Sequence, residues 1–351
     1  MTPARLARLL SACAGCVVAA ALAAAPGAAR AWEPTAPIEL VVPAGTGGGA
    51  DQMARLIQAL VARHKLAPQP INVVNKAGDS GVEGLMVVKA ARGDPHKLVI
   101  TLSNLFTAPL AEGVDFAWSD ITPVQMLALD QFVLWVNARS PHRSGQDLFD
   151  AMRRAPPGTL RLGGTGSKQE DQLIAVLLET ATSTRLQYVP LKGGGDVARA
   201  LAAGSVDMTV NNPIEAEALW RAGTLRPLCV LDGKPLAYAA KITGTQAWAD
   251  LPTCMSFGVP VQYLMMRGIF TTPGATPAQV TYYNQLLDRV RALPEWQEFM
   301  ARGAFNPTTM GGERFRGWLD KAASFHRVLM REARFKAAGP AASAPTAGAV
   351  R

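Results

Sequence analysis

The stretch Val41-Val42-Pro43-Ala44-Gly45-Thr46-Gly47-Gly48-Gly49-Ala50-Asp51 decides the fold class of this chain. It follows an apolar run, Ile38 to Val42, that is typical of a buried strand. It precedes a segment, Met53 to Val61, with the three–four apolar spacing of an amphipathic helix. A strand that turns through glycines onto a helix directs several backbone N–H groups, and the positive end of the helix dipole, at one place. The sequence therefore predicts an anion site made of backbone groups.

Two further strand–glycine–helix junctions follow, at Gly163 to Ser167 and at Lys192 to Gly195. The alternation of strand and helix patterns implies parallel sheets covered by helices on both faces. A long apolar segment, Thr122 to Val136, is expected to leave the first sheet, and Tyr263 to Phe270 to return to it. Ligands of such sheets bind beyond the carboxyl ends of the strands, so we expect a cleft between two domains.

Several polar side chains near these loops have two interpretations that the sequence leaves open. Asp51 either caps the first helix turn or accepts a hydrogen bond that orders the loop or holds a ligand N–H or O–H. Ser167 with Glu170 fits a capping box. Lys192 either contacts a carboxylate or is solvated, and Asn211 and Asn212 either bind a ligand or cap the next helix.

The first 31 residues have the pattern of an export leader. Arg5 and Arg8 precede an apolar segment from Leu9 to Ala25, and Ala29-Arg30-Ala31 fits a cleavage site, so we expect cleavage near Ala31 and a periplasmic protein. Lipid attachment at Cys13 stays open as an alternative. Without this segment the net charge falls from +8 to +5, because three arginines and no acidic residue leave with it.

The remaining cysteines, Cys229 and Cys254, form an even pair in an oxidising compartment. A disulfide and two buried thiols are both compatible with the sequence. No metal site is expected, because the four histidines show no ligand spacing to the cysteines or to one another. Those histidines are His64, His96, His142 and His326.

Other functional classes fit the loops less well. A dinucleotide site permits alanine at the position of Ala50 but matches it only weakly, and it expects an acidic residue where the second strand ends in Asn75-Lys76. Neither a Walker loop nor the Gly-x-Ser-x-Gly elbow of a serine hydrolase is present. Basic residues do not interleave with aromatic ones, so nucleic-acid binding has little support. We therefore expect no cofactor, no catalytic residue and no nucleic-acid partner.

In this order the motifs resemble the periplasmic solute receptors of tripartite tricarboxylate transporters, the Bug receptors. The similarity extends from about Pro37 to about Leu329. The segments that carry it are the loop from Pro43 to Asp51, Val73 to Gly78, Gly164 to Ser167, Val189 to Gly194, Gly204 to Asp207, Ala222 to Leu228 and Arg267 to Gly274. Three positions depart from the pattern, at Leu191, Asn211 and Lys76, and they leave the identity of the ligand open.

The resemblance implies a two-domain α/β receptor of the periplasmic-binding-protein type II class, with a ligand cleft between the domains. It implies domain 1 at residues 32–130 and 250–336 and domain 2 at 131–249. The tail at 337–351 is rich in Ala, Pro, Gly and Ser and has no apolar period, so its composition predicts disorder. It also implies a monomer that closes on a mono-, di- or tricarboxylate and delivers it to a membrane permease. The residues that match the ligand-binding positions are Thr46, Gly47, Gly48, Gly49, Asp51, Thr165, Gly166, Ser167, Lys192, Gly193 and Asn211. The alternatives are an exported hydrolase-like enzyme that uses Ser167 or Asp51, and a ligand sensor for a membrane kinase.

Overall fold

The computed structural model describes residues 32–333 of the chain. By its internal contacts the chain divides into two units, Met1–Glu33 and Pro34–Arg351, and every helix and strand described below belongs to the second unit. The predicted leader and the predicted tail lie outside the described residues.

The first sheet is built around the apolar strand that precedes the first glycine loop. In spatial order the sheet contains β11 (Met310–Gly311), β4 (Thr122–Gln131), β10 (Leu264–Thr271), β3 (Lys97–Thr101), β1 (Ile38–Val42) and β2 (Ile71–Asn75). β1 pairs in parallel with β2 and β3, and its apolar side chains are buried on both faces. This burial explains why its sequence is continuously apolar and does not alternate with polar residues.

The second sheet contains, in spatial order, β7 (Gln187–Leu191), β6 (Arg161–Thr165), β8 (Met208–Thr209), β5 (Val133–Asn137) and β9 (Leu225–Val230). β6 pairs in parallel with β7 and β8, whereas β5 is antiparallel to β8 and β9. In the first sheet β10 is likewise antiparallel to β3 and β4. The sheets are therefore mixed and not parallel throughout as expected, because β10 in the first sheet and β5 in the second, each next to a crossing between the sheets, run against their neighbours.

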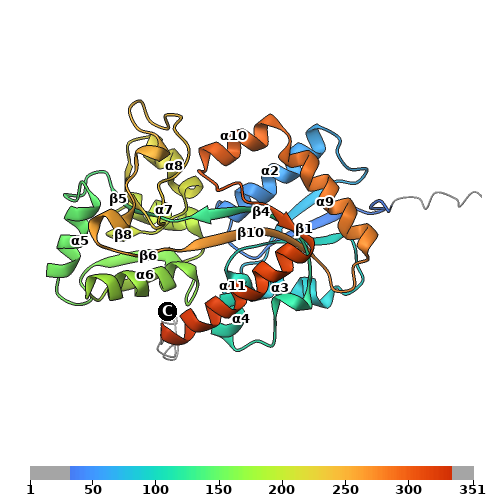
Figure 1. Ribbon diagram of the computed structural model, residues 1–351, viewed down its shortest axis with the longest axis horizontal. Helices are drawn as coiled ribbons and strands as arrows, with labels where there is room; N and C mark the ends of the chain where they lie inside the picture. Colours follow the sequence, from blue (N-terminus) through green and yellow to red (C-terminus); the bar gives the residue numbers. More distant parts are fainter. Residues whose placement is uncertain (1–31, 334–351) are drawn as a thin grey trace, which may run out of the picture. The chain divides into compact units, whose positions relative to one another are not determined.

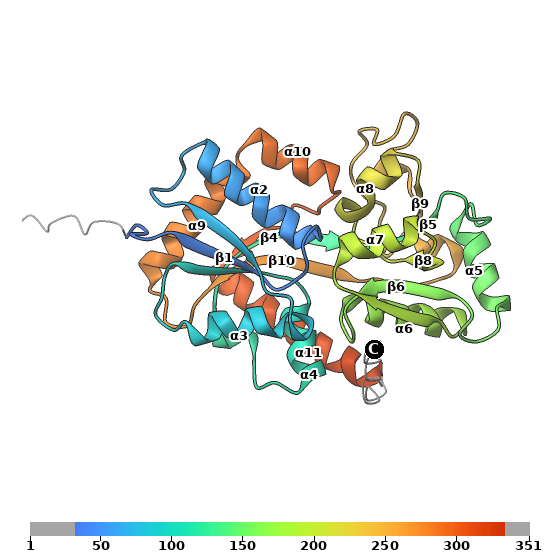
Figure 2. The same ribbon diagram turned by 180° about the vertical axis from the view of Figure 1, so that it is seen from behind.

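Helices cover both faces of each sheet. α2 (Gly49–Arg63), α9 (Pro277–Arg291) and α10 (Pro294–Arg302) lie on one side of the first sheet, and α3 (Val82–Ala90), α4 (Asn104–Glu112) and α11 (Gly312–Glu332) on the other (Figure 1). α7 (Gly194–Ala202) and α8 (Pro213–Arg221) cover one side of the second sheet, and α5 (Gly145–Arg154) and α6 (Glu170–Thr182) the other (Figure 2). α4 was not predicted, because its sequence contains Pro109, a residue that usually marks the end of a helix.

Two segments connect the sheets. β4 ends at Gln131 and β5 begins at Val133 in the other sheet, while β10 brings the chain back after β9. Both crossings follow the sequence prediction. Beside them, the fully buried Arg267 of β10 donates to Asp130 of β4, with an Nη2–Oδ2 distance of 2.5 Å.

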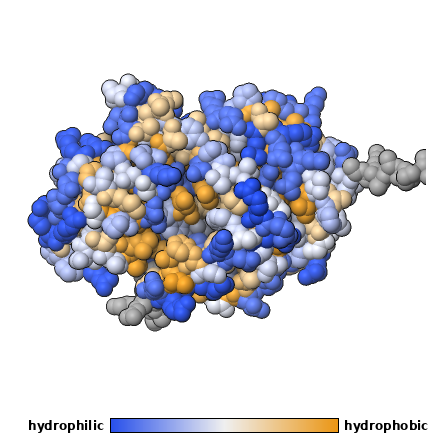
Figure 3. All heavy atoms as spheres, viewed as in Figure 1, coloured by the Kyte–Doolittle hydropathy of each residue, from blue (hydrophilic) through white to orange (hydrophobic). Residues whose placement is uncertain are grey.

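Each sheet packs against its own hydrophobic core. The first core includes Phe270 and Phe315, and the second includes a cluster of three tryptophans, Trp135, Trp220 and Trp248. Polar residues cover most of the surface in Figure 3, and apolar residues gather near the middle of that face. None of the helices between residues 32 and 333 is long and apolar enough to cross a membrane.

A disulfide joins Cys229 and Cys254, whose Cα atoms are 5.1 Å apart. The sequence was compatible with either a disulfide or two buried thiols, and the structure contains the disulfide. It ties β9 to a short 3-10 helix, Cys254–Phe257, across a sequence separation of 25 residues. A loop of this length is consistent with a stabilisation of about 3 kcal/mol.

Candidate functional site

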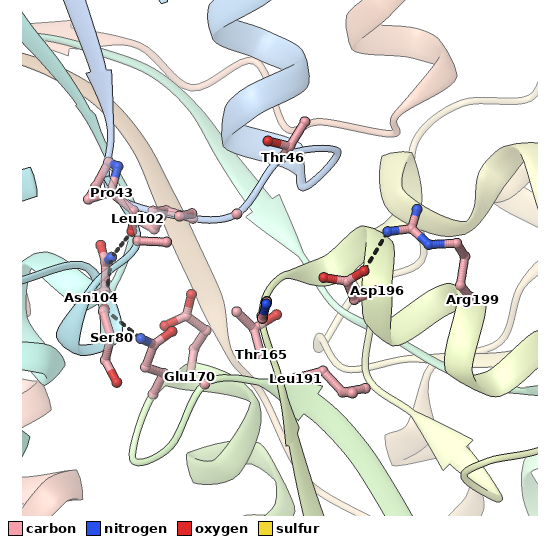
Figure 4. A pocket seen from close by; sticks show the side chains of 16 residues that line it. Pro43, Thr46, Ser80, Leu102, Asn104, Thr165, Glu170, Leu191, Asp196 and Arg199 are labelled. Carbon is pink, nitrogen blue, oxygen red and sulfur yellow. Dashed lines mark hydrogen bonds and ion pairs between the residues drawn. The ribbon is translucent and has the colours of Figure 1, made fainter. Parts of the chain in front are cut away.

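A cavity of about 570 Å³ lies beyond the carboxyl ends of strands from both sheets. Figure 4 shows its side chains converging from the two sheets onto one space. The first sheet and its helices contribute Pro43, Ala44, Gly45, Thr46, Ala77, Ser80, Leu102 and Asn104. The second sheet and its helices contribute Thr165, Gly166, Gln169, Glu170, Leu191, Lys192, Asp196 and Arg199. The cavity therefore has the position that the strand–glycine–helix pattern predicts.

The first glycine loop packs directly against the loop that follows β7. A Cβ on Gly45 would lie 2.8 Å from the Lys192 carbonyl oxygen, and a Cβ on Gly195 would lie 3.2 Å from the Gly47 carbonyl oxygen. Only glycine allows the two backbones to approach so closely without a shift of one loop. The backbones of the loops at residues 45–49 and 192–195 are thus in direct contact.

The carboxylate of Asp51 organises the first loop from inside. It accepts hydrogen bonds from Gly47 N at 2.8 Å, from Asn75 Nδ2 at 3.0 Å and from Arg55 Nε at 3.0 Å. Burial of Asp51 opposes ionisation, but these hydrogen bonds and the charge of Arg55 outweigh it and hold the pKa of Asp51 below its usual value. Asp51 is 2% exposed, so its contacts are with the protein.

A second carboxylate, Glu215 at the start of α8, reaches across to the first loop. Its Oε1 accepts from Gly49 N at 3.0 Å, and its Oε2 accepts from Asn211 Nδ2 at 3.0 Å and from Asn212 N at 3.1 Å. Gly49 N, the backbone amide at the start of α2 where the sequence predicts an anion, therefore already donates to a carboxylate of the same chain. Glu215 also forms the capping box of α8 with Asn212.

The loop after β6 meets the first sheet at a different place. Gln169 Nε2 donates to the Ser80 carbonyl oxygen at 2.5 Å, and Tyr188 Oη donates to the carbonyl oxygens of Thr165 and Gly166 at 3.1 and 2.9 Å. The predicted capping role of Ser167 was wrong. α6 begins at Glu170 after Gln169, and Ser167 is an exposed loop residue.

Glu170 is the most unusual side chain of the cavity. It is 4% exposed, and its Oε2 has no hydrogen-bond partner among the described residues. Burial raises the pKa of Glu170 to about 7, although its own backbone N–H and the charge of Arg267 act in the opposite direction. The adjacent Asp171, whose Oδ2 accepts from Thr165 N at 2.6 Å, is also buried, and its pKa is raised by burial and by the charge of Glu170.

The predicted site residues fall into three groups. Thr46, Thr165, Gly166 and Lys192 line the main cavity. Gly48, Gly49 and Gly193 line a recess of about 20 Å³, and Ser167 lines an adjoining open depression. Gly47, Asp51 and Asn211 line none of these three spaces; in the structure, Asp51 and Asn211 are tied to the loops around them.

Residues 53–324 match the family model described as "Tripartite tricarboxylate transporter family receptor". The chain belongs to this family. The receptor is 32% identical to protein BugT of Bordetella pertussis over 225 residues, which cover 62% of the receptor and 67% of BugT. The sequence-based assignment to the Bug receptors is thus confirmed.

Solved structures share the fold of the receptor. MatC from Rhodopseudomonas palustris, with bound malate, has a TM-score of 0.70 and 21% identity, over 86% of the receptor and 98% of MatC. A second R. palustris protein, with adipate, has a TM-score of 0.73 and 24% identity over the same shares. The predicted two-domain α/β fold of the periplasmic-binding-protein type is confirmed, whereas the domain limits at residues 131 and 249 stay predictions. Proteins of this family are periplasmic solute-binding receptors.

Sequence reasoning missed Glu170 and Asn104 as lining residues of the receptor. Glu170 was interpreted as half of a capping box, and Asn104 belongs to the unpredicted helix α4. A usable indication existed for Asn104, because it follows the carboxyl end of β3 by three residues. Nothing in the local sequence indicated that Glu170 would be buried without a partner. None of the four histidines lines the main cavity.

Proposed function

We propose that this receptor captures one small organic acid in the cavity between its two sheets and delivers it to the membrane permease of a tripartite tricarboxylate transporter. The observation that carries the proposal is the cavity of about 570 Å³, bounded by strand ends from both sheets. This volume lies within the range of small-molecule sites. The malate and adipate in the two related structures support a ligand of this size and class.

The cavity can hold a carboxylate without a dedicated arginine clamp. The first-turn amides of α7, at Gly194 and Gly195, cannot form intrahelical hydrogen bonds, and the positive end of the helix dipole lies with them. Lys192, Thr46 and Thr165 line the main cavity, as does Arg199, which is paired there with Asp196. Gly47 N and Gly49 N, in contrast, already donate to Asp51 and Glu215. The ligand carboxylate therefore binds toward the residue 192–195 loop.

Binding and closure are coupled in this proposal. The ligand bridges groups from both sheets, and the two crossings after β4 and before β10 act as the hinge. The contacts between Gly49 and Glu215 and between Gln169 and Ser80 belong to the closed form. A ligand that touches both sides favours closure by its differential affinity for the closed form.

Calorimetry and thermal shift with a panel of mono-, di- and tricarboxylates test the proposal. We expect one acid or a narrow set to bind, and to raise the melting temperature. The variant Gly45→Val should lose this binding while remaining folded, because its Cβ would meet the backbone oxygen of Lys192 at 2.8 Å and hold the loops apart. Gly244→Ala is the control, since a Cβ there meets nothing within 4 Å. Binding of no acid, or unchanged binding by Gly45→Val, would contradict the proposal.

Export and delivery are the remaining parts of the proposal. We expect the chain to act as a monomer in the periplasm after cleavage near Ala31. Mass spectrometry of the periplasmic form would measure the mature amino terminus. Uptake of the identified acid by cells that lack only this receptor should fall to background and recover when the gene is restored.

A further inference from the structure

Two buried acceptor oxygens of residues at one end of the cavity have no donor. Asn104 Oδ1 and Glu170 Oε2 have no hydrogen-bond partner among the described residues, and their side chains are 1% and 4% exposed. Both residues line the main cavity, and Figure 4 shows their side chains at the same end of it. A buried acceptor without a donor is unfavourable, so this pair indicates where a ligand supplies N–H or O–H groups.

The orientation of the Asn104 amide is fixed by its neighbours. Its Nδ2 donates to the carbonyl oxygen of Pro43 at 2.8 Å and to that of Ser80 at 3.4 Å. Because both partners are carbonyl oxygens, they can only accept, and Oδ1 remains the atom available to a ligand. Gln169, the neighbour of Glu170, donates to the same Ser80 carbonyl oxygen, which places the two acceptors in one corner of the cavity.

Acidic side chains surround this corner, and burial raises the pKa of both Glu170 and Asp171. Asp171 follows Glu170 and is also buried, and Glu215 lines the adjoining recess together with both. The nearby guanidinium of Arg267 is already paired with Asp130 at 2.5 Å. A bound cation would pair with the ionised forms of these side chains and lower their raised pKa values, whereas a second carboxylate would meet like charges unless the side chains stayed protonated.

From these contacts we infer that Glu170 and Asn104 form a subsite for a protonated amine, so that the receptor selects an acid that also carries an ammonium group. This inference rests on the proposed function and narrows its ligand class. An ammonium group has three N–H donors, enough for both free oxygens. The carboxylate of the same molecule then points toward Lys192 and the first-turn amides of α7, because Arg199 at that end of the cavity is already paired with Asp196.

Pairs of ligands matched in length test the subsite. The purified receptor is titrated with succinate and 4-aminobutanoate, glutarate and 5-aminopentanoate, and adipate and 6-aminohexanoate, in each of which one carboxylate is replaced by an aminomethyl group. We expect the amino acid of at least one pair to bind about tenfold or more tightly than the diacid, the scale of a charge-assisted hydrogen bond. Glu170→Gln should remove this preference, because the amide keeps the shape and loses the charge. Glu313→Gln, at a position 93% exposed, is the matched control.

The outcomes separate the two proposals. Diacids that bind more tightly than their amino partners, with Glu170→Gln unaffected, would overturn the subsite and leave the receptor function intact. That result would mean that Glu170 donates a proton to a carboxylate or binds water alone. Binding of no ligand from the acid panel or from the pairs would instead overturn the proposed function. Because the wild-type comparison needs no variant, a folding defect of Glu170→Gln would leave the test valid.

Discussion

The first glycine loop and the loop after β6 differ in how many hydrogen-bond donors surround their buried carboxylates. In the first loop, Asp51 accepts three hydrogen bonds from Gly47, Asn75 and Arg55, and Glu215 satisfies Gly49 from the other sheet. In the second, Glu170 is equally buried and one of its oxygens has no donor.

The difference separates structural carboxylates from a recognition group. A carboxylate with several donors stabilises the loop that surrounds it, and its pKa falls, as for Asp51. A buried carboxylate with one oxygen left without a donor destabilises the protein when it is ionised, and its pKa rises, as for Glu170. Such a cost is common where a site is shaped for a ligand.

The largest effect is expected from Glu215→Ala. The change leaves Gly49 N and Asn212 N without an acceptor, removes one of the two acceptors of Asn211 Nδ2, and breaks the hydrogen bond between the first loop and the Glu215 side chain of α8. The free energy of unfolding should fall by about 3–5 kcal/mol, since each lost buried partner costs roughly 1–3 kcal/mol. Urea denaturation measures it, with the exposed Glu298→Ala as control. A loss below about 1 kcal/mol would place Glu215 among the recognition groups instead.

Asp51→Asn should have the next largest effect, a loss of about 2–3 kcal/mol at neutral pH. Because the folded pKa of Asp51 is lowered, its stabilisation is present above the unfolded value and is lost as the pH falls through the folded value. The difference between wild type and variant should therefore shrink on acidification below about pH 4. Thermal unfolding from pH 3 to 7 measures this, with the exposed Asp115→Asn as control. A difference that does not change with pH would argue against the ionised carboxylate as the cause.

Glu170→Gln should act in the opposite direction and stabilise the ligand-free protein by about 1–2 kcal/mol at pH 8. The folded pKa of about 7 exceeds the unfolded value, so the folded state keeps a proton that the unfolded state loses. Wild-type stability thus decreases as the pH rises from about 4 to about 7, and the variant lacks this part of the decrease. Asp130, whose pKa burial also raises to about 7 despite the opposing charge of Arg267, contributes the same slope to both proteins. A variant less stable than wild type at pH 8 would show that Glu170 has a structural donor.

The smallest effect is expected from Lys192→Met at the exposed edge of the cavity. Loss of one positive charge should slow association of an anionic ligand about two- to fivefold at low salt, with little change at high salt. Stopped-flow fluorescence at two ionic strengths measures the rate, with the exposed Lys234→Met as control. A similar decrease of the association rate at high salt would indicate a direct contact between Lys192 and the bound ligand.

Much of this receptor was determined by local sequence. The apolar run from Ile38 to Val42 must be a central strand, and the glycines after it permit a turn onto a helix that places amides beyond the strand end. The long apolar segment after Thr122 changes sheets as expected, because β4, in which eight of ten residues are buried, is followed at once by a second mostly buried strand. The order of these motifs was also enough to identify the family.

Only the tertiary structure decided which of those backbone amides already have an acceptor, and which buried carboxylate, that of Glu170, has an oxygen without a donor. Gly49 and Glu215 are 166 residues apart, so no local pattern could show that the helix amide was already occupied. The same holds for Asn104, whose amide is oriented by Pro43, 61 residues earlier. The partners of hydrogen-bond donors and acceptors come from residues that only the folded chain brings together. Sequence periodicity indicates only which face of a helix or strand is buried.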